Sequence, residues 1–95
     1  MFNVKIKFLS LLTDITGVEE LNLPIKEGVN IRTILEQLTV KFGPKFEEMI
    51  FKSSKDLSKY VIITVNSKDI RILDELNTEI QLDDEISFIP AIAGG

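Results

Sequence analysis

Residues 2–8 alternate strictly between apolar and polar side chains, and this alternation constrains the fold more than any other feature. The apolar positions are Phe2, Val4, Ile6 and Phe8. Polar side chains, among them Lys5 and Lys7, occupy the positions between them. Side chains two residues apart share one face of a strand, so this pattern predicts a strand that is apolar on one face only. Such a strand needs another element to cover its apolar face.

The segment best suited to cover that face is a single amphipathic helix over residues 31–42. Its apolar residues recur with helical spacing and are Ile31, Ile34, Leu35, Leu38 and Phe42. Asn30 is placed to cap its first turn, Gly43 occupies the position after its last turn, and Pro44 prevents its continuation. A further short turn or helix is predicted to carry Phe46, Met49 and Ile50.

Three further strands are predicted along the chain. Residues 21–25 alternate again, and Pro24 within them indicates an edge strand because proline lacks a backbone donor. Residues 60–65 are apolar on nearly every position, which is typical of an interior strand. Residues 86–89 form the last strand. The order of strands and helix predicts an α+β domain in which a mixed sheet of four to five strands packs on one main helix.

The connections between these elements are shorter and less regular. Residues 11–17 are expected to be a connector that turns at Gly17, where a positive φ is readily adopted. Residues 66–69 are expected to be a turn, with Asn66 as the turn former. Ile70 and Ile72 indicate a short returning strand. Residues 73–81 are expected to be irregular, with Leu76 and Ile80 as apolar anchors.

The chain closes on a short tail of small and aliphatic residues. Because Pro90 removes a backbone donor, we expect the last strand to end there, with a domain over residues 1–89 and a tail over residues 90–95. The tail consists of Pro90, Ala91, Ile92, Ala93, Gly94 and Gly95. Glycines without side chains could enter a channel only as wide as a backbone, and the reactive group at the tip is the Gly95 carboxylate. The alternative interpretation is a frayed terminus.

Composition excludes several kinds of chemistry. The 95 residues include neither histidine nor cysteine, which excludes disulfides, thiolate nucleophiles and thiolate zinc sites and removes the usual general base. We therefore assign no catalytic residue, no metal ligand and no bound cofactor. The net charge is −4, without a basic stripe, so a basic partner surface is expected rather than nucleic acid. No apolar run approaches a membrane span, and the expected location is the cytoplasm.

The last fourteen residues resemble a family-specific pattern. They read Leu82-Asp83-Asp84-Glu85-Ile86-Ser87-Phe88-Ile89-Pro90-Ala91-Ile92-Ala93-Gly94-Gly95. Together with the order of elements, they resemble the ubiquitin-like sulfur carriers of the MoaD/ThiS superfamily, closest to the small subunit of molybdopterin synthase. Three features depart from that pattern. Asp83 replaces a turn glycine, Ala91 replaces a second proline, and residues 43–59 are longer, as in archaeal-type variants.

This resemblance implies a β-grasp fold and a carrier that is not itself an enzyme. The Gly95 carboxylate would be adenylated with ATP on an E1-like activating enzyme and converted to a thiocarboxylate. The carrier would then donate sulfur on the large subunit of molybdopterin synthase or an equivalent acceptor enzyme. One alternative is a ubiquitin-like modifier joined to lysines, or a carrier for tRNA thiolation or thiamine synthesis. Another is a β-grasp interaction domain without tail chemistry.

Two apolar residues occupy the polar face of the predicted strands. Leu9 shares that face with Lys5 and Lys7, and Ile89 shares it with Ser87. If the first and last strands pair, Leu9 and Ile89 meet beside the tail, and either Ile62 or Ile63 faces the same side. We predict that they form a docking surface, and the alternative is that they simply cap the sheet. The acidic runs 47–48 and 83–85 are interpreted as solvated charges.

Overall fold

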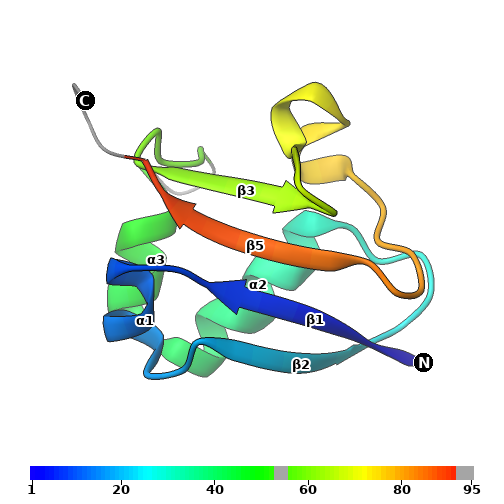
Figure 1. The fold of residues 1–95 in the computed structure, drawn as a ribbon, viewed down its shortest axis with the longest axis horizontal. Helices are drawn as coiled ribbons and strands as arrows, with labels where there is room; N and C mark the ends of the chain where they lie inside the picture. The colour runs from blue at the N-terminus through cyan, green and yellow to red at the C-terminus, as the bar shows by residue number, and fades with distance from the viewer. Residues whose placement is uncertain (53–55, 92–95) are drawn as a thin grey trace.

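The computed structural model describes residues 1–52 and 56–91, and within them five strands form one mixed sheet. The strands are β1 (Phe2–Phe8), β2 (Glu20–Ile25), β3 (Val61–Val65), β4 (Lys68–Asp69) and β5 (Glu85–Pro90). Their spatial order is β2-β1-β5-β3-β4, so the last strand lies in the middle of the sheet. It pairs in parallel with β1 and antiparallel with β3 (Figure 1). The end of β5 therefore lies on the side of the molecule opposite the N-terminus.

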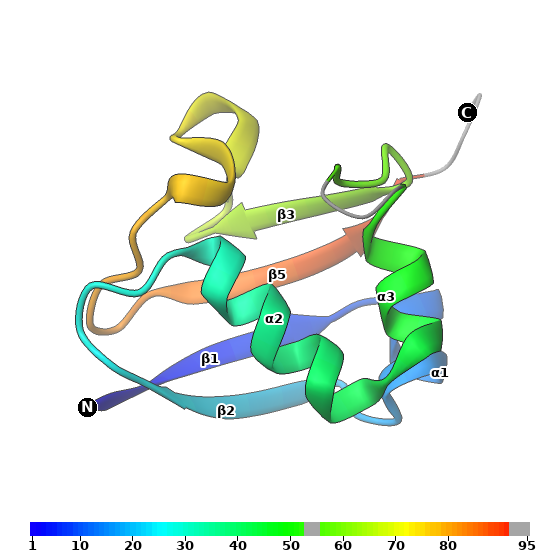
Figure 2. The same ribbon diagram turned by 180° about the vertical axis from the view of Figure 1, so that it is seen from behind.

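Helices cover one face of this sheet and leave the other face open. The α-helices are α1 (Leu11–Thr16), α2 (Ile31–Phe42) and α3 (Pro44–Ile50), and two 3₁₀ turns are η1 (Ile70–Ile72) and η2 (Glu75–Asn77). Figure 2 shows α2 crossing the sheet diagonally, with α3 continuing beside the ends of β1 and β5. None of the described helices has the length and apolar character needed to span a membrane. The predicted α+β arrangement is confirmed.

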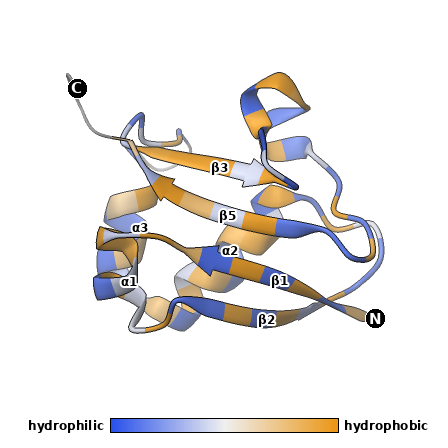
Figure 3. Cartoon of the chain, in the orientation of Figure 1, coloured by the Kyte–Doolittle hydropathy of each residue, from blue (hydrophilic) through white to orange (hydrophobic). Residues whose placement is uncertain are grey.

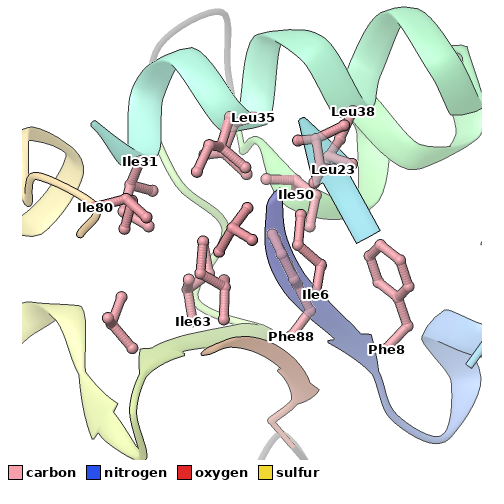
Figure 4. Close-up of a cluster of buried hydrophobic side chains, with 14 of the residues drawn as sticks. Ile6, Phe8, Leu23, Ile31, Leu35, Leu38, Ile50, Ile63, Ile80 and Phe88 are labelled. Carbon is pink, nitrogen blue, oxygen red and sulfur yellow. The ribbon is translucent and has the colours of Figure 1, made fainter. Parts of the chain in front are cut away.

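The core lies between α2, α3 and the sheet, and an aromatic cluster lies at the end of it where β1 and α2 finish. Phe8 and Phe88 occupy the same level of the parallel β1–β5 pair, and their ring centroids are 5.4 Å apart. Phe42 and Phe46 approach the Phe8 ring edge-on at 5.6 and 6.2 Å, a geometry that adds to simple burial. Figure 4 shows aliphatic side chains of both layers facing one another across the rest of the core, including Leu35, Leu38, Ile50, Ile6 and Ile63.

The predicted alternation and helix are confirmed in detail. In β1 the side chains of Val4, Ile6 and Phe8 are buried. Figure 3 shows the matching change of hydropathy along β1, whereas β3 is hydrophobic over most of its length. Helix α2 has the predicted bounds, and the Asn30 side chain accepts a hydrogen bond from the Thr33 N–H at 3.0 Å. The short helix predicted around Phe46 is α3.

Two connections differ from the predictions. Residues 11–17 are not a plain connector, because they form α1, whose Leu12 is fully buried; six residues are too few for helical periodicity to be recognised. Gly17 does end this segment with φ of 77°. Ile70 and Ile72 do not form the returning strand, which is β4 at Lys68–Asp69. The chain instead coils into η1 and buries Ile70 in the core.

Asn66 does more than form the turn that was predicted for it. It and Ser67 both have positive φ, 52° and 71°, and this two-residue turn matches the twist of a hairpin. The Asn66 carboxamide also accepts from the Glu85 N–H at 2.9 Å and donates to the Asp84 carboxylate at 2.7 Å. Asn66 therefore joins the β3–β4 hairpin to the start of β5.

Leu38→Ala should lower the free energy of unfolding by about 2–5 kcal/mol, because Leu38 is fully buried between α2 and the sheet. The measurement is a denaturant titration. The matched control is Val40→Ala in the same helix, where the side chain is 87% exposed and the change should stay within about 0.5 kcal/mol. Equal effects of the two substitutions would contradict the assigned buried face of α2.

Asn66→Gly should cost about 1–2 kcal/mol of unfolding free energy, because it keeps the positive φ but removes both side-chain hydrogen bonds. Asn66→Ala should cost about 1 kcal/mol more, since alanine also disfavours the left-handed conformation. Thermal or denaturant unfolding of the pair separates the two contributions. A glycine variant as stable as the wild type would mean that the Asn66 bonds to Asp84 and Glu85 contribute nothing.

Candidate functional site

The candidate site begins where β5 reaches the edge of the molecule. Pro90 is the last residue of β5 and lies opposite Val61 of β3. The Ala91 N–H then donates a further hydrogen bond to the Tyr60 carbonyl at 2.8 Å. Backbone pairing to β3 thus extends to Ala91, one residue beyond the predicted end of the ladder. The tail residues Ile92, Ala93, Gly94 and Gly95 lie outside the described residues.

The direction of the backbone explains why a proline fits at the end of a central strand. Peptide groups of an antiparallel strand point alternately to its two sides, and those of Ala91 and Glu85 point to β3. Those of Phe88 and Pro90 point to β1, and the Phe88 carbonyl accepts from the Leu9 N–H at 3.1 Å. Because β1 ends at Phe8, the N–H that Pro90 lacks would face no strand in the described structure. The proline removes no ladder bond there.

Apolar side chains gather beside this strand end on the open face of the sheet. Ile62 pairs directly with Ile89, and both are half-buried, whereas Ile63 is only 2% exposed and belongs to the core. Leu9 comes one residue after Phe8, the last residue of β1 that pairs with β5, and it is 41% exposed. Tyr60 has the same strand parity as Ile62 and is 48% exposed. We call Leu9, Ile89, Ile62 and Tyr60 the open-face patch.

The structure thus settles which isoleucine shares the face of Ile89, and it adds a residue that sequence reasoning missed. Ile62 lies on that face, and Ile63 does not. Tyr60 was placed within a strand but not within the candidate docking surface. The period of two from Ile62 would have placed it there.

Charged residues border the open-face patch. Lys7 forms a salt bridge with Glu85 at 3.1 Å, and Lys5 approaches Glu20 at 3.9 Å. A shallow hollow that Leu9 helps to line is bordered by residues of β1, β2, α1 and β5 and of the loops between them, among them Lys7, Ser10, Thr13, Glu19, Glu20 and Glu85. Carboxylates outnumber ammonium groups around this hollow. It therefore complements a basic partner surface.

The acidic run 83–85 has structural partners, whereas the run 47–48 is exposed. Asp83 adopts a positive φ of 71°, so aspartate serves in place of a turn glycine as expected. Asp84 accepts hydrogen bonds from the Asn66 side chain and from the Gln81 N–H, each at 2.7 Å. Glu47 and Glu48 are exposed on α3. Over residues 1–52 and 56–91, no group of three or more acidic residues is arranged to hold a metal ion.

The strand order and the single layer of helices define a ubiquitin-like β-grasp domain, with the end of its central strand beside an apolar patch. The model of the ThiS family matches residues 6–95. The chain therefore belongs to the ThiS family, which confirms the resemblance seen in the sequence.

Individual relatives carry related names. A protein of Archaeoglobus fulgidus named "Putative sulfur carrier protein" is 40% identical over 69 residues, which cover 73% of this chain and 77% of that protein. The small archaeal modifier protein 1 of Methanosarcina acetivorans is 31% identical, with a TM-score of 0.84 and coverage of 100% of this chain and 98% of that one. A "Putative molybdopterin converting factor, subunit 1" from Pyrococcus furiosus has a TM-score of 0.79 at 24% identity, with 97% and 100% coverage. The chain thus has the fold shared by sulfur carriers and small archaeal modifiers.

Leu9→Asp or Ile89→Asp should leave the domain folded but weaken its binding to an activating enzyme by about tenfold or more, because a charge would enter the centre of the open-face patch. Val40→Asp is the matched control, since it places the same charge on an exposed site of α2. Melting curves and binding titrations give both readouts. Unfolding of both patch variants would show that these residues serve the fold instead.

Proposed function

We propose that this protein is a sulfur carrier that is adenylated and then thiocarboxylated at Gly95. The single observation that carries the proposal is the position of β5. The strand is held by β1 up to Phe88 and by the β3 side up to Ala91, where the tail has begun. A strand held in this way gives the following residues a defined starting point beside the open-face patch. Such a patch gives an activating enzyme a surface to bind while the tail enters its nucleotide site.

The proposed chemistry needs only one reactive group from this chain. A carboxylate oxygen of Gly95 attacks the α-phosphorus of ATP on the partner enzyme, and pyrophosphate leaves. A hydrosulfide ion supplied by the partner then attacks the acyl carbon, the bond to the phosphate oxygen breaks, and adenosine monophosphate and a proton leave, which yields a thiocarboxylate. The partner supplies the nucleotide site and the sulfur source. This division suits a chain without histidine and cysteine.

For the acceptor we propose the precursor of molybdopterin, bound to the large subunit of molybdopterin synthase. The support is the resemblance of residues 82–95 to the small subunit of that enzyme. The name of the Pyrococcus furiosus protein also refers to molybdopterin, but at 24% identity its likeness to this chain supports the fold alone. Conversion of the precursor by the thiocarboxylated protein and a purified large subunit is the direct test. Failure of conversion with a fully thiocarboxylated carrier would overturn this assignment and leave the carrier proposal standing.

A second function, attachment to lysines of other proteins, is favoured by one specific relative. The small archaeal modifier protein 1 of Methanosarcina acetivorans covers the whole of this chain at 31% identity. The modifier and the carrier share the activated tip and differ in the acceptor, which is a lysine amine for the modifier. Recovery of branched Gly-Gly-lysine peptides from cells would support the modifier. An increase in intact mass by the difference between a sulfur and an oxygen atom would support the carrier.

Deletion of Gly95 should abolish ATP–pyrophosphate exchange by the cognate activating enzyme while leaving the melting temperature unchanged. The physical reason is that one residue withdraws the carboxylate by about 3.3–3.6 Å, and an error of about 1 Å can already cost a hundredfold. Extension beyond Gly95 and the substitution Gly94→Val should act similarly. The substitution adds bulk and closes off positive φ.

The matched control is a single glycine added before Met1, which is exposed and lies at the opposite end of the molecule from the end of β5 (Figure 1). This variant should exchange like the wild type. If the Gly95 deletion also exchanged normally, the carrier and the modifier would both be rejected. A β-grasp interaction domain without tail chemistry would then remain.

A further inference from the structure

The outer edge of β3 is only partly covered by its neighbour. Strand β4 pairs with Thr64 and Val65 alone. Residues 61–63 therefore have no strand beside them on that side in the part of the chain that the structure describes. Figure 2 shows this length of β3 between two walls, the turns of residues 70–77 at one end and the loop of residues 56–60 at the other. Within it Ile63 is buried, whereas Val61 is half-buried.

The peptide groups along this edge are directed outward. The Tyr60 carbonyl accepts from Ala91, and the Asn66 N–H donates to Glu85, each at 2.8 Å, so even-numbered residues of β3 pair with β5. Because an antiparallel strand alternates, the odd-numbered Val61 and Ile63 point their N–H and C=O groups away from β5. Val61 lies farthest from β4. Its outward backbone groups match what another extended chain offers.

A groove runs along this edge between the two walls. It is lined by Val61, Ile62, Ile63, Leu57, Ile70, Arg71, Glu75 and Leu76, together with neighbouring residues of both walls. Hydrogen bonds hold the first wall in place, from the Ser58 N–H to the Ile50 carbonyl at 2.7 Å and from the Tyr60 N–H to the Ser58 hydroxyl at 3.0 Å. The second wall is closed by the bond from the Leu73 N–H to the Ile70 carbonyl at 3.0 Å. The groove is therefore built into the fold.

The groove offers apolar contacts and a carboxylate. Leu57 and Leu76 are half-buried at its sides. Arg71 is engaged by Asp69, whose two carboxylate oxygens accept from its guanidinium, and this bonding holds the pKa of Asp69 below its usual value. Glu75 forms no salt bridge within residues 1–52 and 56–91 and stands in the second wall. Lys59, in the first wall, lies over the Tyr60 ring at 5.8 Å.

We propose that the open edge of β3 binds an extended, basic segment of a partner protein by strand addition. The segment pairs its backbone with Val61, places apolar side chains against Leu57 and Leu76, and brings a cationic side chain to Glu75. The net charge of −4 favours a basic segment over an acidic one. A second copy of this chain is a poorer occupant. It carries the same charge, and both walls extend past the edge of β3 (Figure 2).

This site is distinct from the tail chemistry and does not depend on it. It shares Ile62 with the open-face patch, so one partner can extend from the open face onto this edge. Strand addition derives its affinity from main-chain hydrogen bonds and its selectivity from side-chain pockets. The walls admit a short segment and exclude a long strand, which also protects the edge from aggregation.

The test uses the full chain and a synthetic peptide, acetyl-Lys-Val-Thr-Val-Thr-Val-Lys-amide, in an NMR titration. The amide of Val61 should shift with a saturable dependence on peptide and become protected from hydrogen exchange. The Ile62 amide points to β5, so its protection should not change. The same peptide with its central amides N-methylated should not bind, since it cannot donate backbone hydrogen bonds. Saturable binding of the methylated peptide, or the absence of saturable shifts with the parent peptide, would overturn the proposal.

Three variants sharpen the test. Val61→Pro removes an outward N–H without removing a bond to β5, and should weaken binding about tenfold. Glu75→Lys should weaken it about threefold. Glu27→Lys makes the same change of charge in the loop after β2, at the opposite edge of the sheet, and should have no effect.

Melting curves establish that each variant is folded, and the Glu75→Lys result stands even if the proline variant is not. If Glu75→Lys and Glu27→Lys weakened peptide binding equally, the effect would come from the net charge of the protein alone. That result would overturn the assignment of the peptide to this groove. Light scattering tests whether a second copy of this chain binds the edge instead. A doubling of mass that Val61→Pro abolishes would assign the edge to a second copy and overturn the partner segment.

Discussion

The contact between Phe8 and Phe88 is the interaction on which most of this structure depends. Their rings lie 5.4 Å apart across a parallel pair formed by the first and last strands. A parallel pair between strands so distant in sequence incurs a loop-closure entropy that local contacts do not repay. The aromatic cluster with Phe42 and Phe46 offsets that cost, because it also holds α2 and α3 on the sheet. The central position of β5, and hence the position of its end, follows from this packing.

Long periodic segments made much of the fold predictable from the sequence. The alternation over residues 2–8 and the helical spacing over residues 31–42 each extend long enough to identify β1 and α2. Shorter segments were not predictable in this way. Helix α1 depends on the burial of Leu12, and η1 depends on the burial of Ile70, and both are decided by contacts with distant parts of the chain. Tertiary packing overrides local preference at such places.

The residues of the candidate site were likewise only partly predictable from the sequence. The alternation of side chains along each strand was enough to predict that Leu9 and Ile89 lie on the same kind of face. That prediction does not depend on which strands are paired, because successive side chains of any strand point to opposite faces. Parity could not decide between Ile62 and Ile63, since that needs the register of β3 against β5. The groove beside Val61 was beyond sequence reasoning altogether. It exists because the chain leaves the β4 ladder after Asp69 to bury Ile70, which shortens the neighbour that would have covered the edge.

The hydrogen bond from Ala91 to the Tyr60 carbonyl also sets a length scale for any enzyme that uses the C-terminus. Four residues follow Ala91, and an extended chain of that length spans at most about 14 Å. An enzyme whose reaction centre lies within that depth can act on the folded domain as it stands. A deeper centre requires the ladder to open at Ala91, and after it at Ile89, the next residue of β5 whose peptide groups face β3. The free energy of breaking the last hydrogen bonds between β5 and β3 would then be subtracted from the free energy of binding. The end of the sheet would thus oppose insertion of the tail into the partner.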